Sequence, residues 1–196
     1  MISVTDEDII AATKLNEQQK DAYDQILNKV FRDESTSFFI DGHGGTGKTF
    51  LYRAILATVK SKKIIALATT SSEVDASILP GGGTAHSRFK FSLQLENKST
   101  CNITKESSLA KLLQMTKIII WDESPMINKY AVEALDNMQR DVTECDLPFG
   151  GKVIVLGGDF CQVLPVIPQG KKEEIFNASS PLLKVKLVAE LSEVLI

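Results

Sequence analysis

The chain has 196 residues, a net charge of −3 at neutral pH, 43% hydrophobic residues and 24% charged residues. These values are typical of one folded domain and exclude bulk disorder. The charge argues against a strongly basic nucleic-acid-binding protein but leaves room for a local basic groove. Because no apolar run reaches the roughly 18 residues of a membrane helix, we expect no membrane partner.

The N-terminus and the cysteines bear on the cellular compartment. Residues 1–20 begin acidic and polar, and they resemble neither a secretory signal nor an Arg-rich transit peptide. The three cysteines, Cys101, Cys145 and Cys161, are widely spaced and form no CxxC pair. We therefore expect no disulfide framework, no zinc site and a reducing compartment.

Helical patterns and short apolar runs alternate along the chain. The first helical pattern has Asn16 at its start and Gln19 three positions later, which predicts an N-terminal cap. The expected helices are 15–31, 49–60, 106–115 and 129–145, and the expected strands are 37–41, 64–68, 118–121, 153–156 and 184–191.

The apolar runs lack the polar alternation of a half-exposed strand. Such runs are typical of strands that helices cover on both faces. Strands separated by helices predict an α/β fold with a parallel sheet and right-handed crossovers. Ligands of such sheets bind at the carboxyl ends of the strands, and each motif described below follows a predicted strand.

A glycine-rich turn follows the strand at 37–41. Its sequence, GHGGTGKT, fits the G-x-x-x-x-G-K-[ST] pattern of a P-loop. The glycines let backbone amides point at phosphates, the lysine reaches the β- and γ-phosphates, and the threonine hydroxyl serves magnesium. A chance match is expected in roughly one chain in a hundred of this size, and the flanking strand and helix favour a nucleotide site. The predicted residues are Gly42, His43, Gly44, Gly45, Thr46, Gly47, Lys48 and Thr49.

Two carboxylates, Asp122 and Glu123, end the strand predicted at 118–121. In P-loop enzymes an aspartate at this place holds magnesium, usually through water, and a neighbouring glutamate polarises the attacking water. A solvated strand end is the alternative. The P-loop upstream favours the catalytic interpretation, with Asp122 and Thr49 as the metal ligands.

Two glutamines are weaker candidates. Gln162 follows the strand at 153–156 and is a candidate γ-phosphate sensor, with Asp159 to orient it. An ordinary turn is the more frequent explanation. Gln19 carries an amide that is able to read an adenine edge, although a surface glutamine is the default.

Residues 84–91 interleave basic and aromatic side chains. In an extended segment the basic residues would share one face and the two phenylalanines the other, so that cations meet phosphates and rings stack on bases. A half-buried strand with its phenylalanines in the core is the alternative, and the pattern alone favours it. Residues 69–72 offer hydroxyls and amides to a phosphate backbone, with a plain loop as the default. The candidate DNA-contacting residues are Thr70, His86, Arg88 and Phe89.

In this order the segments resemble those of the Pif1-like helicases, within superfamily 1 of DNA helicases. The adenine-reading Q motif resembles LNEQQKDAYDQIL, Walker A resembles FFIDGHGGTGKTFLYRAI, and Walker B resembles IIIWDESPMI. Motifs Ia and Ic resemble ATTSSEVDASILPGGGTAHSRFKFSL, and motif III resembles VIVLGGDFCQVLPVIPQG. The resemblance runs from about residue 15 to the end, and GGDFxQxLPV together with TAHSxFKF is specific to the family.

The resemblance implies a RecA-like ATPase domain that uses ATP and Mg²⁺ and contacts single-stranded DNA. It implies that Gln19 contacts adenine, that Lys48 and Thr49 serve the phosphates and magnesium, that Asp122 and Glu123 drive hydrolysis, that Gln162 senses the γ-phosphate, and that His86 and Phe89 border the DNA path. We expect residues 1–14 to be an N-terminal extension and 15–196 the first motor domain, without the second.

The sequence also departs from the family pattern. Cys161 stands where the family has arginine in GDFRQ, and Val194 and Ile196 stand at the asparagine and arginine positions of L-T-E-N-M-R. The expected function is the ATPase domain of a 5′-to-3′ DNA helicase of repair, recombination and telomere maintenance, which does not unwind DNA by itself. The alternative is a truncated or degenerate member that binds ATP and DNA without unwinding.

A nucleotide kinase or signalling GTPase fits less well, because no N-K-x-D guanine reader or kinase lid is visible. We expect a monomer. The resemblance implies a nuclear or mitochondrial compartment, and the lack of an Arg-rich leader favours the nucleus.

Overall fold

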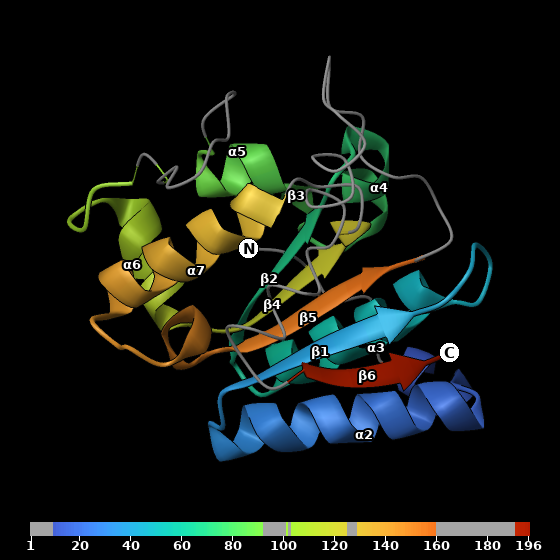
Figure 1. The fold of residues 1–196 in the computed structure, drawn as a ribbon. Helices are drawn as coiled ribbons and strands as arrows, with labels where there is room; N and C mark the ends of the chain where they lie inside the picture. The colour runs from blue at the N-terminus through green and yellow to red at the C-terminus, as the bar shows by residue number, and fades with distance from the viewer. Residues whose placement is uncertain (1–9, 92–100, 102, 125–128, 160–190) are drawn as a thin grey trace.

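The structure is a computed structural model that describes residues 10–91, 101, 103–124, 129–159 and 191–196 (Figure 1). Within these ranges, no helix combines the length and the apolar character needed to cross a membrane. The helices are η1 (Ala12–Lys14), α2 (Glu17–Arg32), α3 (Lys48–Ser61), α4 (Glu73–Ile78), α5 (Ala85–Phe89), α6 (Ser108–Met115), α7 (Lys129–Thr143) and η3 (Pro148–Gly151). The strands are β1 (Thr36–Asp41), β2 (Ile65–Thr70), β3 (Gly83–Thr84), β4 (Thr116–Asp122), β5 (Val153–Gly158) and β6 (Leu191–Leu195).

The six strands form one sheet in the order β3-β2-β4-β5-β1-β6, and every neighbouring pair is parallel. The predicted α/β fold with a parallel sheet is therefore confirmed. The predicted helices and the first four predicted strands are all present, with ends that shift by a few residues. The last strand begins at Leu191, and the rest of the segment predicted at 184–191 lies outside the described residues.

Helices cover both faces of the sheet, as Figure 1 shows for α2 and α3 on one side and α6 and α7 on the other. The strand side chains divide between two cores. Phe38 and Ile40 of β1 pack in the core that α2 and α3 cover, whereas Phe39 packs with Trp121 in the core that α5, α6 and α7 cover. The two-sided burial explains why the strand sequences lack polar alternation.

The start of α2 shows how local sequence sets a helix boundary. The Asn16 side chain accepts a hydrogen bond from the Gln19 backbone N–H at 2.8 Å, and the Gln19 side chain accepts one from the Asn16 N–H at 3.1 Å. This reciprocal cap satisfies two of the amides that a helix start leaves free. The predicted cap is confirmed.

The segment at 84–91 is not the extended strand that we considered. Thr84 caps a short helix, α5, by accepting a hydrogen bond from the Ser87 N–H at 3.3 Å, and Lys90 ends it with a φ of 53°. A cap threonine followed by one helical turn leaves no strand alternation. The prediction that basic and aromatic side chains lie on opposite faces of a strand is therefore wrong.

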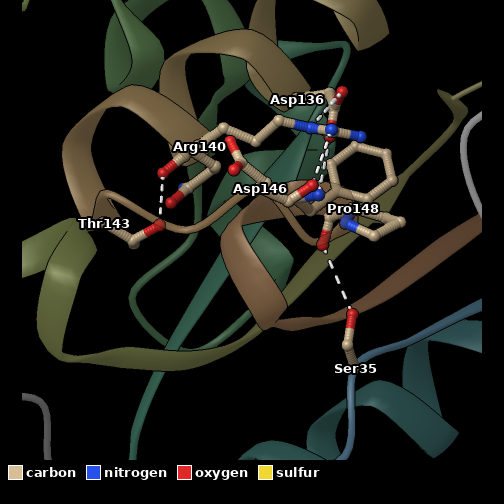
Figure 2. A network of polar contacts seen from close by, with 8 residues as sticks. Ser35, Asp136, Arg140, Thr143, Asp146 and Pro148 are labelled. Carbon is tan, nitrogen blue, oxygen red and sulfur yellow. Dashed lines mark hydrogen bonds and ion pairs between the residues drawn. The ribbon is translucent and has the colours of Figure 1, made fainter.

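A polar network ties α7 to the entry of β5 (Figure 2). The buried Asp136 carboxylate accepts hydrogen bonds from Arg140 Nε at 3.0 Å and from the Phe149 backbone N–H at 2.6 Å. Phe149 and Gly150 have φ values of 50° and 64°, and a Cβ on Gly150 would lie 2.3 Å from Thr143 Oγ1. The carboxylate thus holds a left-handed turn that leads directly into β5.

Replacing Asp136 with alanine is expected to lower the free energy of unfolding by about 3 kcal/mol, because the change leaves Arg140 and the Phe149 amide without their acceptor. The measurement is urea unfolding followed by circular dichroism. Asp141→Ala on the same helix is the matched control. Its exposed carboxylate pairs with Lys105 at 3.0 Å, and we expect a loss below about 1 kcal/mol. Equal losses in the two variants would contradict this role of Asp136.

Candidate nucleotide-binding site

The carboxyl ends of four strands meet at one edge of the sheet. Asp41 at the end of β1 lies opposite Gly158 of β5, and Thr70 at the end of β2 lies opposite Asp122 of β4. The Gly42 N–H continues the ladder by donating to the Gly158 carbonyl oxygen at 3.2 Å. The predicted P-loop, the acidic pair and Asp159 are therefore brought to the same edge.

The P-loop backbone turns at two glycines with positive φ. Gly45 has a φ of 88° and Gly47 a φ of 87°, values that side chains with a Cβ rarely adopt. A Cβ on Gly47 would also lie 2.6 Å from Gln19 Nε2, and one on Gly42 would lie 2.6 Å from Thr46 Oγ1. The turn delivers the chain to the N-terminus of α3, where backbone amides and the helix dipole favour an anion.

Lys48 is the first residue of α3 and is only 7% exposed. Its ammonium group donates to the carbonyl oxygen of Gly42 at 2.5 Å and lies 3.4 Å from that of His43. A buried ammonium needs partners for its three donors, and the loop carbonyls supply two acceptors within the chain. Thr49, the predicted metal ligand, follows at the helix start and is half-buried.

Gln19 braces the P-loop from α2. Its Nε2 donates to the Thr46 carbonyl oxygen at 2.8 Å, while its Oε1 accepts from Asn16. A primary amide has a second N–H and a second lone pair, so these bonds do not use its full capacity. Contact between Gln19 and adenine stays a prediction, and the structure adds a second role in holding the loop.

Asp122 and Glu123 lie at the end of β4, next to the P-loop. The Asp122 carboxylate is 6% exposed, and burial raises its pKa to about 6. Its Oδ1 accepts the Glu123 backbone N–H at 3.0 Å. Glu123 is half-buried, burial also raises its pKa, and its φ is 53°. Positive φ is strained for a residue with a side chain, so the surroundings must hold this conformation.

One such restraint comes from Ser71, which the sequence analysis considered only as part of a phosphate-contacting loop at 69–72. The Ser71 hydroxyl donates to the carbonyl oxygen of Glu123 at 2.6 Å, which ties the loop after β2 to the acidic pair. Ser124 Oγ donates to the Gly157 carbonyl oxygen at 3.1 Å and ties the same turn to β5. Neither hydrogen bond could be predicted from a local sequence pattern, because its two partners lie far apart in the sequence.

His43 and Asp159 join the P-loop to the end of β5. His43 Nδ1 lies 2.9 Å from Asp159 Oδ2, with His43 exposed and Asp159 buried. The hydrogen bond to Asp159, together with the charge of that carboxylate, raises the pKa of His43. Asp159 was expected to orient Gln162. Gln162 and Cys161 both lie outside the described residues.

Of the four candidate DNA-contacting residues, one is exposed, and the other three are buried or hydrogen-bonded within the protein. His86 is exposed on α5. Arg88 is half-buried and donates to the Gly81 carbonyl oxygen at 2.6 Å. Thr70 is fully buried and donates its hydroxyl to the Ser72 carbonyl oxygen at 2.9 Å, so that hydroxyl is not available to a phosphate here. Phe89 is 0% exposed and packs 5.9 Å from the Trp121 ring. The Phe89 ring is therefore part of the core and is not free to stack on a base in this structure, and its place beside a DNA path stays a prediction.

Comparison with known proteins finds similarity to the PIF1-like helicases. A model of the PIF1-like helicase family matches residues 14–195. The ATP-dependent DNA helicase RRM3 of Saccharomyces cerevisiae is 32% identical over 159 residues, which are 77% of this chain and 21% of that protein. The ATP-dependent DNA helicase Pif1 of Campylobacter jejuni is 32% identical over 148 residues, 72% of this chain and 31% of that protein.

The fold has the same relatives. The crystal structure of Pif1 helicase from Candida albicans matches with a TM-score of 0.72 and 24% identity, over 93% of this chain and 40% of that chain. The expected RecA-like fold is thereby confirmed. The chain spans less than a third of the length of the two curated relatives above.

The His43–Asp159 pair predicts a pH effect. The pKa of His43 is expected above its ordinary 6.5 and should fall in an Asp159→Asn variant, as measured by NMR titration of the imidazole. Because the folded state raises this pKa, the stabilisation is complete below about pH 6.5 and is lost as pH rises through the raised value. The same His43 pKa in both proteins would show that the pair does not form.

Proposed function

Because this chain belongs to the PIF1-like helicase family, we propose that it is a helicase motor domain that binds ATP with Mg²⁺, hydrolyses the nucleotide and contacts single-stranded DNA. The observation that carries the proposal is the buried Lys48 ammonium at the P-loop turn, close enough to Asp122 and Glu123 to interact with both carboxylates electrostatically. An isolated phosphate-binding turn would not need those carboxylates. The relatives named above are ATP-dependent DNA helicases.

Binding begins with the P-loop. The amides of the turn and of the α3 N-terminus donate to the phosphate oxygens of the nucleotide. The Lys48 ammonium, which donates to loop carbonyls in this structure, turns part of its donor capacity to the β- and γ-phosphates. Gln19 keeps the turn in shape through Thr46 and presents its unused N–H and lone pair to adenine.

The donor set fits Mg²⁺. This ion prefers oxygen ligands and is commonly held by one or two carboxylates together with substrate phosphates, rather than by an all-protein cage. Asp122 offers a buried carboxylate with unused lone pairs, and Thr49 offers a hydroxyl at the start of α3. When bound, the ion neutralises charge on the phosphate oxygens.

Hydrolysis is assigned to Glu123. Its carboxylate accepts a proton from water as the water oxygen attacks the γ-phosphorus, the bond to the bridging oxygen breaks, and ADP and phosphate leave. The raised pKa of Glu123 suits a base, because proton transfer works best when the pKa approaches the working pH. Ser71 holds the backbone from which this side chain projects.

Single-stranded DNA is the proposed partner, and a monomer is the proposed state. Two structural neighbours are described as Bacteroides Pif1 bound to ssDNA and as Bacteroides Pif1 in complex with ADP-AlF3 and ssDNA. In this chain, His86 and Lys90 are exposed at α5 and offer hydrogen-bond donors to phosphates. The buried side chains of Thr70 and Phe89 would contribute indirectly, by holding the loop after β2 and the helix α5 in place.

Two substitutions separate nucleotide binding from turnover. Lys48→Ala is expected to weaken ATP binding at least about tenfold, because it removes charge-assisted hydrogen bonds. Glu123→Gln is expected to keep ATP affinity and to lower turnover by about 10²-fold or more. Binding is measured by calorimetry with Mg²⁺, and turnover by phosphate release with and without single-stranded DNA.

Lys62→Ala is the matched control for Lys48, since Lys62 is an exposed lysine at the other end of α3. We expect both measurements to be unchanged in this control. Unchanged ATP affinity in Lys48→Ala would contradict the proposed site. No turnover above background in the wild type, with ATP still bound, would instead support the alternative of a binding module without hydrolysis, and measurable but equal turnover in the wild type and Glu123→Gln would show that Glu123 is not the base.

A further inference from the structure

Tyr52 lies on α3 one helical turn after Lys48. Residues four positions apart share a face of a helix, and both side chains are buried, with Tyr52 at 0% exposure. The Tyr52 ring belongs to the core between α3 and the sheet. Its hydroxyl group therefore lies inside the protein, on the side of α3 that carries Lys48.

The Tyr52 hydroxyl is a buried polar group without a hydrogen-bond partner in the described part of the chain. Buried tyrosine hydroxyls usually find a partner, because leaving the group unpaired forfeits its bond to water. A phenylalanine would fill the same space without this penalty. The hydroxyl thus calls for an explanation other than packing.

Gly157 shows where the hydroxyl points. A Cβ on Gly157 would lie 1.8 Å from the Tyr52 oxygen and 3.0 Å from Asp122 Oδ1. The absence of a side chain at the end of β5 therefore leaves room for the phenol, and the same small space borders the Asp122 carboxylate. Tyr52 is a donor beside an acceptor whose lone pairs are incompletely used, since the Glu123 N–H is the donor that Oδ1 has among the described residues.

The electrostatics agree with a donor role. Burial, followed by the charges of Asp122 and Glu123, raises the pKa of Tyr52 well above its ordinary value. A phenol next to a carboxylate stabilises the ionised form of that carboxylate by donating a hydrogen bond to it.

We propose that Tyr52 is a positioning residue of the nucleotide site: its hydroxyl, which has no partner among the described residues of this structure, would donate to Asp122 when a metal–nucleotide complex binds and would orient that carboxylate toward the metal. The inference rests on the proposed function. With Oδ1 accepting from the Glu123 amide and from the phenol, Asp122 would offer its other oxygen to the metal or to a water bound to the metal. Partners that orient metal-binding carboxylates typically contribute to metal affinity.

The test is Tyr52→Phe, which removes one atom and keeps the ring. Mn²⁺ is the probe, and its affinity for the chain in saturating ADP is measured by electron paramagnetic resonance. We expect Tyr52→Phe to weaken Mn²⁺ binding about tenfold, while the affinity for ADP without divalent metal stays the same. Urea unfolding without nucleotide or metal should show a variant at least as stable as the wild type, because the removed hydroxyl has no partner in that state.

Tyr23→Phe is the matched control. The Tyr23 hydroxyl bonds Thr58 Oγ1 at 2.7 Å, near the far end of α3. This variant should lose some stability and keep its Mn²⁺ affinity, the opposite of the pattern expected for Tyr52→Phe.

The outcomes are distinguishable. If the wild type binds neither ADP nor Mn²⁺–ADP, the proposed function fails. If the wild type binds both and Tyr52→Phe binds Mn²⁺ equally well, the role of Tyr52 is overturned while the proposed function stands. A loss of stability in Tyr52→Phe without a change in Mn²⁺ affinity would likewise overturn it, since the hydroxyl would then be structural.

Discussion

The parallel register of the central strands is the constraint on which the site depends. Asp41 is fixed opposite Gly158, and Thr70 opposite Asp122, so four loops leave the sheet at one edge. A shift of one residue would exchange the two faces of a strand. In β1 that shift would move Phe39 out of one core and Phe38 into it. Hydrophobic burial on both faces thus holds the polar groups of the site in place.

The groups at this edge are buried and interlinked. Lys48 is satisfied by loop carbonyls, Gln19 by the loop and its own helix cap, and Glu123 is held in a strained backbone conformation by Ser71. Polar groups out of contact with water are costly unless they are paired. A nucleotide that replaces some internal partners of Lys48 therefore enters a site that is already shaped, and little reorganisation opposes binding.

Local patterns predicted the parts of the molecule that local chemistry controls. The α2 cap follows from Asn16 and Gln19, and the covered strands follow from their unbroken apolar runs. The turn at 42–49 was predicted from its combination of glycines, lysine and threonine, which is uncommon outside P-loops. The helix α5 was missed, because a cap and a single turn leave almost no periodic signal.

Contacts between distant segments had no such signal. Ser71 meets Glu123 across 52 positions, and His43 meets Asp159 across 116. Phe89 of the helix α5 packs in the core against Trp121 of β4, a contact that the alternation of basic and aromatic residues at 84–91 does not reveal. Sequence reasoning therefore named candidate residues that the structure brings to one edge of the sheet, but it did not predict the interactions between them.

The central claim is that the amides of the turn at 42–49 receive the phosphates of a nucleotide. Hydrogen–deuterium exchange with and without Mg²⁺–ATP tests it most directly, since exchange reports the opening of individual amides. We predict that the nucleotide slows exchange about tenfold or more in peptides that cover 42–49, with a smaller effect around Asp122 and Glu123. Unchanged exchange across 42–49 in saturating Mg²⁺–ATP, or protection confined to other segments, would contradict the claim.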